Sequence, residues 1–211
     1  MKWYPIPLGA LQTNCYILAN EDKLCLIFDP GDEGEKLIKW LTAKNFKPQA
    51  ILLTHAHFDH IGGVDTVRDH YQIPVYLHKK EEKWMMDPAL NGSQFFMIGQ
   101  IVRCRPADYY LSQEKKMTIG DFEFSVFETP GHSPGSVSYY FESAGLVVSG
   151  DALFKGGIGR TDLSGGNHQT LLKSIHEKLL TLPENTIVLP GHGPQTLIED
   201  EMDSNPFLNG F

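Results

Sequence analysis

The sequence predicts an α/β fold in which two sheets are sandwiched between helices. Both halves of the chain supply strands followed by a helix, and no linker, charge block or low-complexity tract separates the halves. A chain of 211 residues is most simply one domain. A chain of this size buries roughly 70% of its unfolded surface without disulfide bonds. We therefore expect a single domain over residues 1–211.

The first half begins with a hairpin, because β-prone residues at 14–18 and 24–28 flank a polar turn at 20–23. Residues 34–45 carry a one-faced apolar stripe and predict a helix. Pro48 should break the chain before a short buried strand at 50–53. A helix over 62–71, a strand at 74–78 and a short charged helix at 79–86 complete this half.

The second half is richer in strands. Residues 117–119 and 122–128 flank a Gly-Asp turn, which indicates a hairpin. Further strands are expected at 136–141 and 146–149. Asn167 should cap a helix that runs to about residue 180 and buries Leu171, Leu172, Ile175 and Leu179. Residues 186–189 are predicted to be the last strand.

One stretch concentrates metal-type side chains within six residues, Thr54-His55-Ala56-His57-Phe58-Asp59-His60. It follows the buried strand at 50–53, at the end of a strand, where sites of α/β folds usually lie. In an extended chain His55 and His57 point to the same side, whereas Asp59 and His60 are adjacent and point differently. This arrangement suits two neighbouring metals better than one.

Three later stretches share one design, a strand that ends in a tight turn with a metal-type residue beside glycine or proline. These residues are His132, Asp151 and His192. Glycine and proline fix unusual backbone angles and hold the side chain in one position. Together with the first cluster they become candidate metal ligands. Asp29 precedes Pro30-Gly31, and we interpret it as a structural turn residue rather than a brace for the metal loop.

These motifs resemble the metallo-β-lactamase superfamily and, within it, the glyoxalase II-like (hydroxyacylglutathione hydrolase-like) hydrolases. The resemblance covers essentially the whole chain, including the stretches 13–16, 156–162 and 205–208. It implies a four-layer αββα sandwich with the site at one edge. It also implies that one metal is held by His55, His57 and His132, and the second by Asp59, His60 and His192, with Asp151 bridging the two.

The function that the resemblance implies is hydrolysis of a thioester, such as S-lactoylglutathione, by a hydroxide that bridges the two metals. Asp59 and Asp151 would be the catalytic carboxylates. The nitrogen and oxygen ligands suit zinc, and also iron or manganese. A thiolate is a good leaving group, because the pKa of a free thiol is about 8.5. Arg160 is a candidate substrate contact or a brace for its glycine-rich loop, and His168 a candidate pocket residue or helix cap.

Two alternatives remain. Persulfide dioxygenase-like oxidoreductases share this fold and would use one iron on His55, His132 and Asp151, although Phe58 and the stretch 156–158 favour the hydrolase. The same site could hydrolyse another ester, a lactone or a lactam. A β-lactamase proper is disfavoured, because the short hydrolase pattern is matched from end to end. Full-length glyoxalase II enzymes add a basic helical domain, so we expect the short, single-domain subgroup here.

The bulk composition limits the partners. A net charge of -8 argues against a nucleic-acid partner, which calls for a basic face. No apolar run approaches membrane length. Cys15, Cys25 and Cys104 show no CxxC spacing and are expected to be reduced thiols of a cytoplasmic protein. The expected partner is therefore a small-molecule thioester.

Overall fold

The computed structural model describes residues 1–96 and 101–208. The chain forms two compact units, Met1–Ser112 and Gln113–Phe211, and each unit contains one six-stranded sheet. The single domain expected over residues 1–211 stays a prediction. Within the described ranges, every helix is too short or too polar to cross a membrane.

The first unit is built on a sheet in the order β1-β2-β3-β4-β5-β6. β1, β2 and β3 are antiparallel neighbours, whereas β3 to β6 run parallel. The strands are β1 (Lys2–Leu8), β2 (Thr13–Ala19), β3 (Leu24–Phe28), β4 (Lys47–Leu52), β5 (Val75–His78) and β6 (Tyr109–Leu111). The helices are α1 (Gly34–Ala43), α2 (Phe58–Ile61), α3 (Val64–Tyr71) and the 3-10 turn η1 (Lys79–Glu81).

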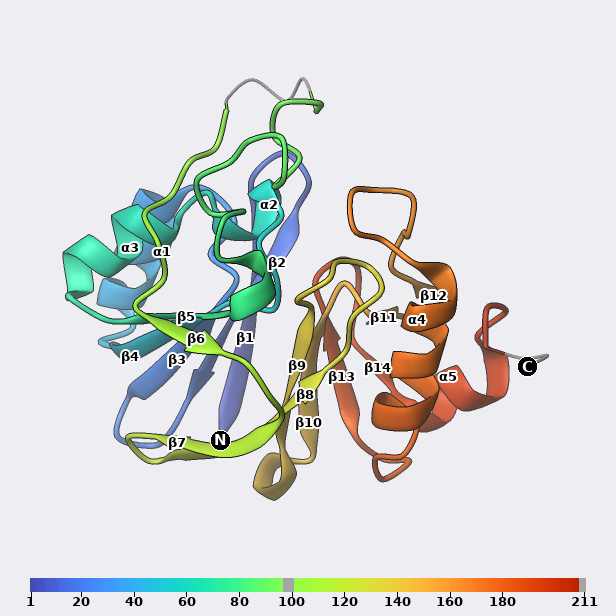
Figure 1. Ribbon diagram of the computed structural model, residues 1–211. Helices are drawn as coiled ribbons and strands as arrows, with labels where there is room; N and C mark the ends of the chain where they lie inside the picture. Colours follow the sequence, from blue (N-terminus) through green and yellow to red (C-terminus); the bar gives the residue numbers. More distant parts are fainter. Residues whose placement is uncertain (97–100, 209–211) are drawn as a thin grey trace. The chain divides into compact units, whose positions relative to one another are not determined.

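α1 and α3 lie side by side on one face of this sheet (Figure 1). Their approach is close at Gly34, where an added Cβ would lie 2.7 Å from Cβ of Thr66. α1 buries Leu37 and Leu41, as its predicted stripe requires. The helix ends where Asn45 adopts a left-handed conformation with φ of 58°, one of the residue types that tolerates it.

The second unit has a sheet in the order β14-β13-β10-β9-β8-β7, in which only β10 and β13 are parallel neighbours. Its strands are β7 (Lys115–Ile119), β8 (Phe122–Glu128), β9 (Val137–Phe141), β10 (Leu146–Gly150), β13 (Ile187–Pro190) and β14 (Thr196–Leu197). A small separate hairpin joins β11 (Leu153–Phe154) to β12 (Gly157–Ile158). The helical elements are η2 (Glu142–Ala144), α4 (His168–Ser174), the π-helix η3 (Ile175–Leu179) and α5 (Ile198–Ser204).

The core of the second unit lies between its sheet and α4 with η3 (Figure 1). The predicted helix after Asn167 is confirmed, because the Asn167 side chain accepts a hydrogen bond from N–H of Thr170. All four residues that were expected to form its buried face are buried: Leu171, Leu172, Ile175 and Leu179. They pack with Val147 of β10 and Val188 of β13.

Several predicted boundaries are wrong. Pro48 does not precede β4 but lies within it, where the register with β3 shifts between Cys25 and Leu26. Asp59 and His60, at the end of the stretch that follows β4, lie on the short helix α2. Residues 186–189 do not form the last strand, since β14 follows. The strands β1 and β6 also add to the sheet of the first unit without having been predicted.

The three cysteines are free and buried in the core of the first unit. Burial raises the pKa of Cys25 and of Cys104 to about 12. Burial also raises the pKa of Cys15 well above its ordinary value, with smaller contributions from Asp29 and Cys25. Thiols of this kind are structural, because only the thiolate is reactive.

We therefore predict that a thiol-specific reagent at pH 8 reacts slowly with the folded protein. A rise in pKa from 9.0 to about 12 lowers the thiolate fraction of Cys25 and Cys104 about a thousandfold. A Ser143→Cys variant supplies the control, since Ser143 is exposed on η2 and its thiol should react at once. Rapid reaction of the original three cysteines without urea would contradict the burial described here.

Candidate functional site

The first unit gathers His55, His57, Asp59 and His60 at the end of β4. The ring centroids of His55 and His57 are 4.8 Å apart, and those of His55 and His60 are 4.0 Å apart. Nε2 of His60 lies 3.6 Å from Oδ2 of Asp59. The three imidazoles are buried, and the Asp59 side chain is 13% exposed. The four candidate ligands of the first cluster thus form one group.

Asp29 braces this group, so its interpretation as a turn residue alone is wrong. Its Oδ1 accepts a hydrogen bond of 2.7 Å from N–H of Thr54, and its Oδ2 accepts one of 2.6 Å from the Thr54 hydroxyl. Oδ2 also lies 3.0 Å from Nδ1 of His60. Asp29 follows β3 and Thr54 follows β4, and parallel neighbours end at the same edge of a sheet. This carboxylate therefore fixes the ring of His60 and the start of the ligand loop.

Asp59 is held by a hydroxyl and by close backbone packing. The Thr13 hydroxyl donates a hydrogen bond of 2.8 Å to its Oδ2. An added Cβ at Gly31 would lie 1.7 Å from the carbonyl oxygen of Asp59, and one at Gly62 would lie 2.4 Å from the carbonyl oxygen of Gly31. Only glycine allows the two loops to approach this closely.

Two residues that sequence reasoning missed anchor the middle of the ligand loop. Oε2 of Glu81, a fully buried carboxylate, accepts a hydrogen bond of 2.6 Å from N–H of Ala56. The carbonyl oxygen of Asn91 accepts one of 3.0 Å from N–H of Phe58. Glu81 lies in a charged segment that looks solvated in the sequence. Its burial depends on a partner 25 positions away, for which no local signal exists.

The second unit gathers His132, Asp151 and His192. Oδ2 of Asp151 lies 3.5 Å from Nε2 of His132 and 3.6 Å from Nε2 of His192. The three residues follow β8, β10 and β13, which run in the same direction and therefore end at the same edge of the sheet. The topology of the unit thus explains why residues so far apart in the chain form a second group.

His132 is oriented by the backbone of the glycine-rich loop. Its Nδ1 lies 2.8 Å from the carbonyl oxygen of Arg160, which can accept a hydrogen bond only when Nδ1 carries the proton. An added Cβ at Gly159 would lie 1.8 Å from the carbonyl oxygen of Asp151 and 3.1 Å from Cβ of His132. This loop therefore packs directly on two candidate ligands, and Nε2 is the nitrogen that His132 directs towards Asp151.

The distances within both groups fit a metal ion. Separations of 3.5–3.6 Å between Nε2 and a carboxylate oxygen are longer than a hydrogen bond. Two ligand atoms at the ordinary zinc bond length and tetrahedral angle are about 3.4 Å apart. Both groups consist of imidazole nitrogens and carboxylate oxygens, which suit zinc and also iron or manganese. Each of these pairs therefore fits two ligands of a shared divalent metal.

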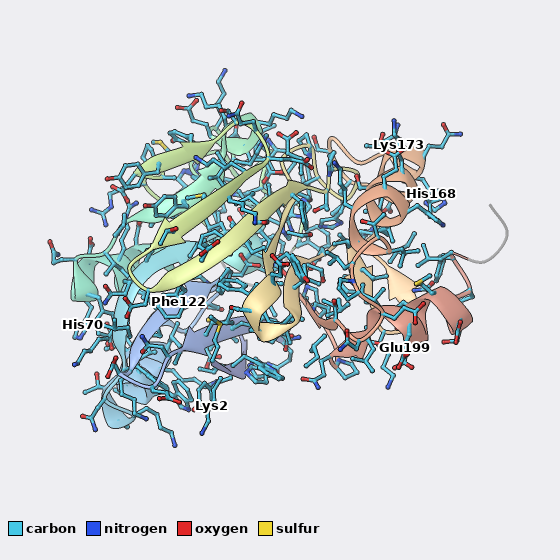
Figure 2. All side chains as sticks on the ribbon, turned by 90° about the horizontal axis from the view of Figure 1, so that it is seen from below. Lys2, His70, Phe122, His168, Lys173 and Glu199 are labelled. Atoms are coloured by element: carbon cyan, nitrogen blue, oxygen red, sulfur yellow. The ribbon has the colours of Figure 1, made fainter. Side chains whose placement is uncertain are left out.

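The two predicted substrate-binding residues lie outside these groups. The Arg160 guanidinium is half-exposed and forms a bidentate pair with Asp162, with both hydrogen bonds at 2.7 Å. This bond lowers the pKa of Asp162 to about 2. His168 is exposed on the first turn of α4 (Figure 2), and Asn167 caps that helix. A contact of either residue with substrate stays a prediction.

A pocket of about 390 Å³ opens beside Asp59 in the first unit. Its walls include the apolar side chains of Leu8, Leu11, Phe58 and Val102, and the turn between β1 and β2 contributes Gly9 and Ala10. The pocket is of the size that binds a small organic ligand. It places apolar surface next to a candidate metal ligand.

Comparisons with known proteins agree with this chemistry. The sequence profile described as Metallo-beta-lactamase superfamily matches residues 8–192. The chain is 57% identical over 211 residues to the probable metallo-hydrolase YqgX of Bacillus subtilis, covering 100% of this chain and 99% of that relative. It is 34% identical over 204 residues to the hydroxyacylglutathione hydrolase GloC of Haemophilus influenzae, covering 97% of this chain and 96% of that relative.

Solved structures are also similar. One described as BLEG-1 B3 metallo-beta-lactamase has a TM-score of 0.97 and 60% identity, covering 99% of this chain and 100% of that chain. Another, TTHA1623 in a di-iron-bound form, has a TM-score of 0.84 and 39% identity, covering 97% of this chain and 100% of that chain. The predicted α/β fold class, with mixed sheets, is confirmed.

The packing at Gly31 can be tested by substitution. We predict that Gly31→Ala destabilises the protein by about 3 kcal/mol or more, because its Cβ would overlap the backbone of Asp59. Gly157→Ala is the control and should change stability by less than about 0.5 kcal/mol, since the nearest atom to its Cβ is 3.9 Å away. Urea unfolding followed by circular dichroism measures both. Equal stabilities for the two variants would contradict the close approach.

Proposed function

This chain belongs to the metallo-beta-lactamase superfamily of metallo-hydrolases, and we propose that its substrate is a thioester of a low-molecular-weight thiol, such as S-lactoylglutathione. The observation that carries the proposal is the pair of ligand groups, one in each unit, with every position of the family pattern filled. A chain that had lost hydrolytic activity would not need to keep all seven ligands.

In this proposal the two groups together hold two divalent metals. His55, His57 and His132 would hold one of them. Asp59, His60 and His192 would hold the other, and Asp151 would be a ligand of both. The proposal is supported by the N···O separations within each group, which suit atoms that share a metal. It is also supported by the hydrogen bonds that Nδ1 of His60 and of His132 donate to acceptors of the protein.

The chemistry divides between the metals and the chain. When bound, a pair of divalent metals supplies Lewis acidity, which lowers the pKa of water towards neutrality and polarises a carbonyl group. The chain orients the ligands: Asp29 fixes His60, the Thr13 hydroxyl fixes Asp59 and the Arg160 carbonyl fixes His132. A thiolate leaves without help from a strong acid, because the pKa of a free thiol is about 8.5.

The choice of a thioester is supported by a relative and by the pocket. GloC of Haemophilus influenzae is named a hydroxyacylglutathione hydrolase. The pocket beside Asp59 can receive the acyl part of a small substrate, since Leu11, Phe58 and Val102 contribute apolar side chains to its walls. The metals are zinc in this proposal, and iron is the second choice because TTHA1623 is described in a di-iron-bound form. The free, buried thiols support a cytoplasmic location.

A lactam is the second candidate substrate. The specific observation in its favour is the 60% identity to a structure described as a B3 metallo-beta-lactamase. Thioesters and lactams both present a polarised carbonyl carbon, and the same ligand groups could act on either. They differ in the leaving group, a thiolate in one case and an amine in the other. A comparison of the rates on the two substrates therefore has to decide between them.

Thioester hydrolysis by this chain can be measured directly. Purified protein supplied with zinc, iron or manganese should release free thiol from S-lactoylglutathione. His132→Ala and Asp151→Ala should abolish release and lower the metal content, because each removes a ligand. His70→Ala is the control and should retain activity, since His70 lies on the surface of α3 (Figure 2). The absence of release with every metal would refute a glutathione thioester as substrate.

The preference of this chain for a thioester over a lactam can also be measured. We expect kcat/KM for S-lactoylglutathione to exceed kcat/KM for a penicillin or a cephalosporin by at least about tenfold, which corresponds to about 1.4 kcal/mol of transition-state binding. Both rates are measured on the same metal-loaded preparation. A higher value for the β-lactam would replace the thioester with the lactam as the main substrate. Oxygen uptake with glutathione persulfide tests the oxidoreductase alternative in the same preparation.

A further inference from the structure

Two sequence stretches have no role in the site as described so far: Gly156-Gly157, at the start of the glycine-rich loop, and the closing stretch Asn205-Pro206-Phe207-Leu208. The structure of the second unit joins them. Glu201, on α5, contacts both of them. This residue belongs to an acidic run that looks solvated in the sequence. Its neighbours Glu199 and Asp200 are exposed, whereas Glu201 is 1% exposed.

The buried carboxylate of Glu201 accepts three hydrogen bonds. Its Oε2 accepts from N–H of Gly156 at 2.9 Å and from the Asn205 side-chain amide at 2.7 Å. Its Oε1 accepts from the Thr196 hydroxyl at 2.6 Å. All three donors are neutral. Burying a charge among neutral groups is unfavourable unless the hydrogen bonds are specific, so this carboxylate is an unexpected choice for packing alone.

Asn205 completes the connection. Its side-chain amide also donates a hydrogen bond of 3.1 Å to the carbonyl oxygen of Gly157, and its Oδ1 accepts one of 3.0 Å from N–H of Phe207. Glu201 and Asn205 therefore bind the N–H of Gly156 and the carbonyl oxygen of Gly157, the two groups that flank the Gly156–Gly157 peptide. This peptide is part of the turn between β11 and β12. The side chains of Glu201, on α5, and of Asn205, directly after α5, thus hold the hairpin at its turn.

The same hairpin leads directly to His132 and Asp151. Two residues beyond Gly157, the Gly159 backbone packs on the carbonyl oxygen of Asp151 and on Cβ of His132. N–H of Gly159 donates a hydrogen bond of 3.3 Å to the carbonyl oxygen of Ala152. One residue further, the Arg160 carbonyl oxygen meets Nδ1 of His132 at 2.8 Å. A shift of the hairpin would move the acceptor that sets the direction of His132.

We infer that Glu201 and Asn205 are positioning residues for the candidate ligands His132 and Asp151. They act through the hairpin and the Gly159-Arg160 peptide, and they touch neither the metal nor the substrate. The inference gives both stretches one purpose and explains the buried carboxylate. It rests on the proposed function in one respect, namely that His132 and Asp151 bind metal. The orientation of the His132 ring does not depend on that proposal.

Glu201→Gln tests the inference, because glutamine keeps the size but replaces one acceptor oxygen with a donor. The first readout is made without metal: the exchange with water of the His132 Nδ1 proton, followed by nitrogen-15 NMR. We expect exchange at least about tenfold faster, since the Arg160 acceptor moves. The second readout is zinc affinity by competition with a chelator. We expect the dissociation constant to rise about tenfold, the low end for residues that orient ligands.

Two variants of the same unit serve as controls. Glu199→Gln makes the same change of charge on the outside of α5 (Figure 2) and should alter neither readout. Thr196→Val removes the hydrogen bond to Oε1 of Glu201 but leaves the bonds to the hairpin. It should lower the thermal midpoint without a change in the exchange of the His132 proton. Should Glu201→Gln fail to fold, Asn205→Ala enters the same comparison, because it removes the bond to Gly157.

The outcomes separate the inference from the proposed function. Faster exchange in Glu201→Gln but not in Thr196→Val supports positioning. Equal changes in both variants, in proportion to their thermal midpoints, would mean that Glu201 is merely structural. Unchanged exchange and zinc affinity in Glu201→Gln would refute the inference outright. If the original chain binds no metal, the proposed function fails, while the exchange measurement still decides whether Glu201 orients His132.

Discussion

The hydrogen bond that Nδ1 of a candidate ligand histidine donates to an acceptor of the protein is the interaction on which much of the surrounding structure depends. His60 makes this bond with the carboxylate of Asp29, and His132 makes it with the carbonyl oxygen of Arg160. The bond fixes both the ring direction and the nitrogen that is left to bind a metal. A histidine ring that could turn would bind a metal more weakly even with every ligand present. The groups that accept the Nδ1 hydrogen bonds must therefore be held as firmly as the ligands themselves.

Glycine packing keeps those acceptors in place. In the first unit, the loop that carries Asp29 approaches Asp59 so closely that Gly31 cannot hold a side chain. In the second unit, Gly159 has the same relation to Asp151. Close backbone contacts are stiff, because neither of the two backbone segments can move towards the other without a clash. The two units thus reach the same result, a ligand pressed against a neighbouring loop, with unrelated sequences.

Much of this could be predicted from the sequence, where the signal is local. Strands β3 and β8 have the predicted ends, because turn residues bound a β-prone run on both sides. β1 was missed since Pro5 and Pro7 argue against a strand, yet an edge strand tolerates proline. The candidate ligands were found by residue type and spacing. Glu81 and Glu201 were not, because their burial depends on partners 25 and 45 positions away.

The buried carboxylates also indicate what the fold has been selected for. Asp29, Glu81 and Glu201 each accept a backbone N–H of a loop that carries or supports candidate ligands: those of Thr54, Ala56 and Gly156. An apolar residue of similar volume often stabilises a protein as well as a buried charged group does. Stability therefore does not require these three acids. A carboxylate specifies the position of a backbone in a way that apolar packing cannot, because its hydrogen bonds have a direction and a length. All three occur where a ligand loop needs such a fixed point, so the requirement they meet is the geometry of the site.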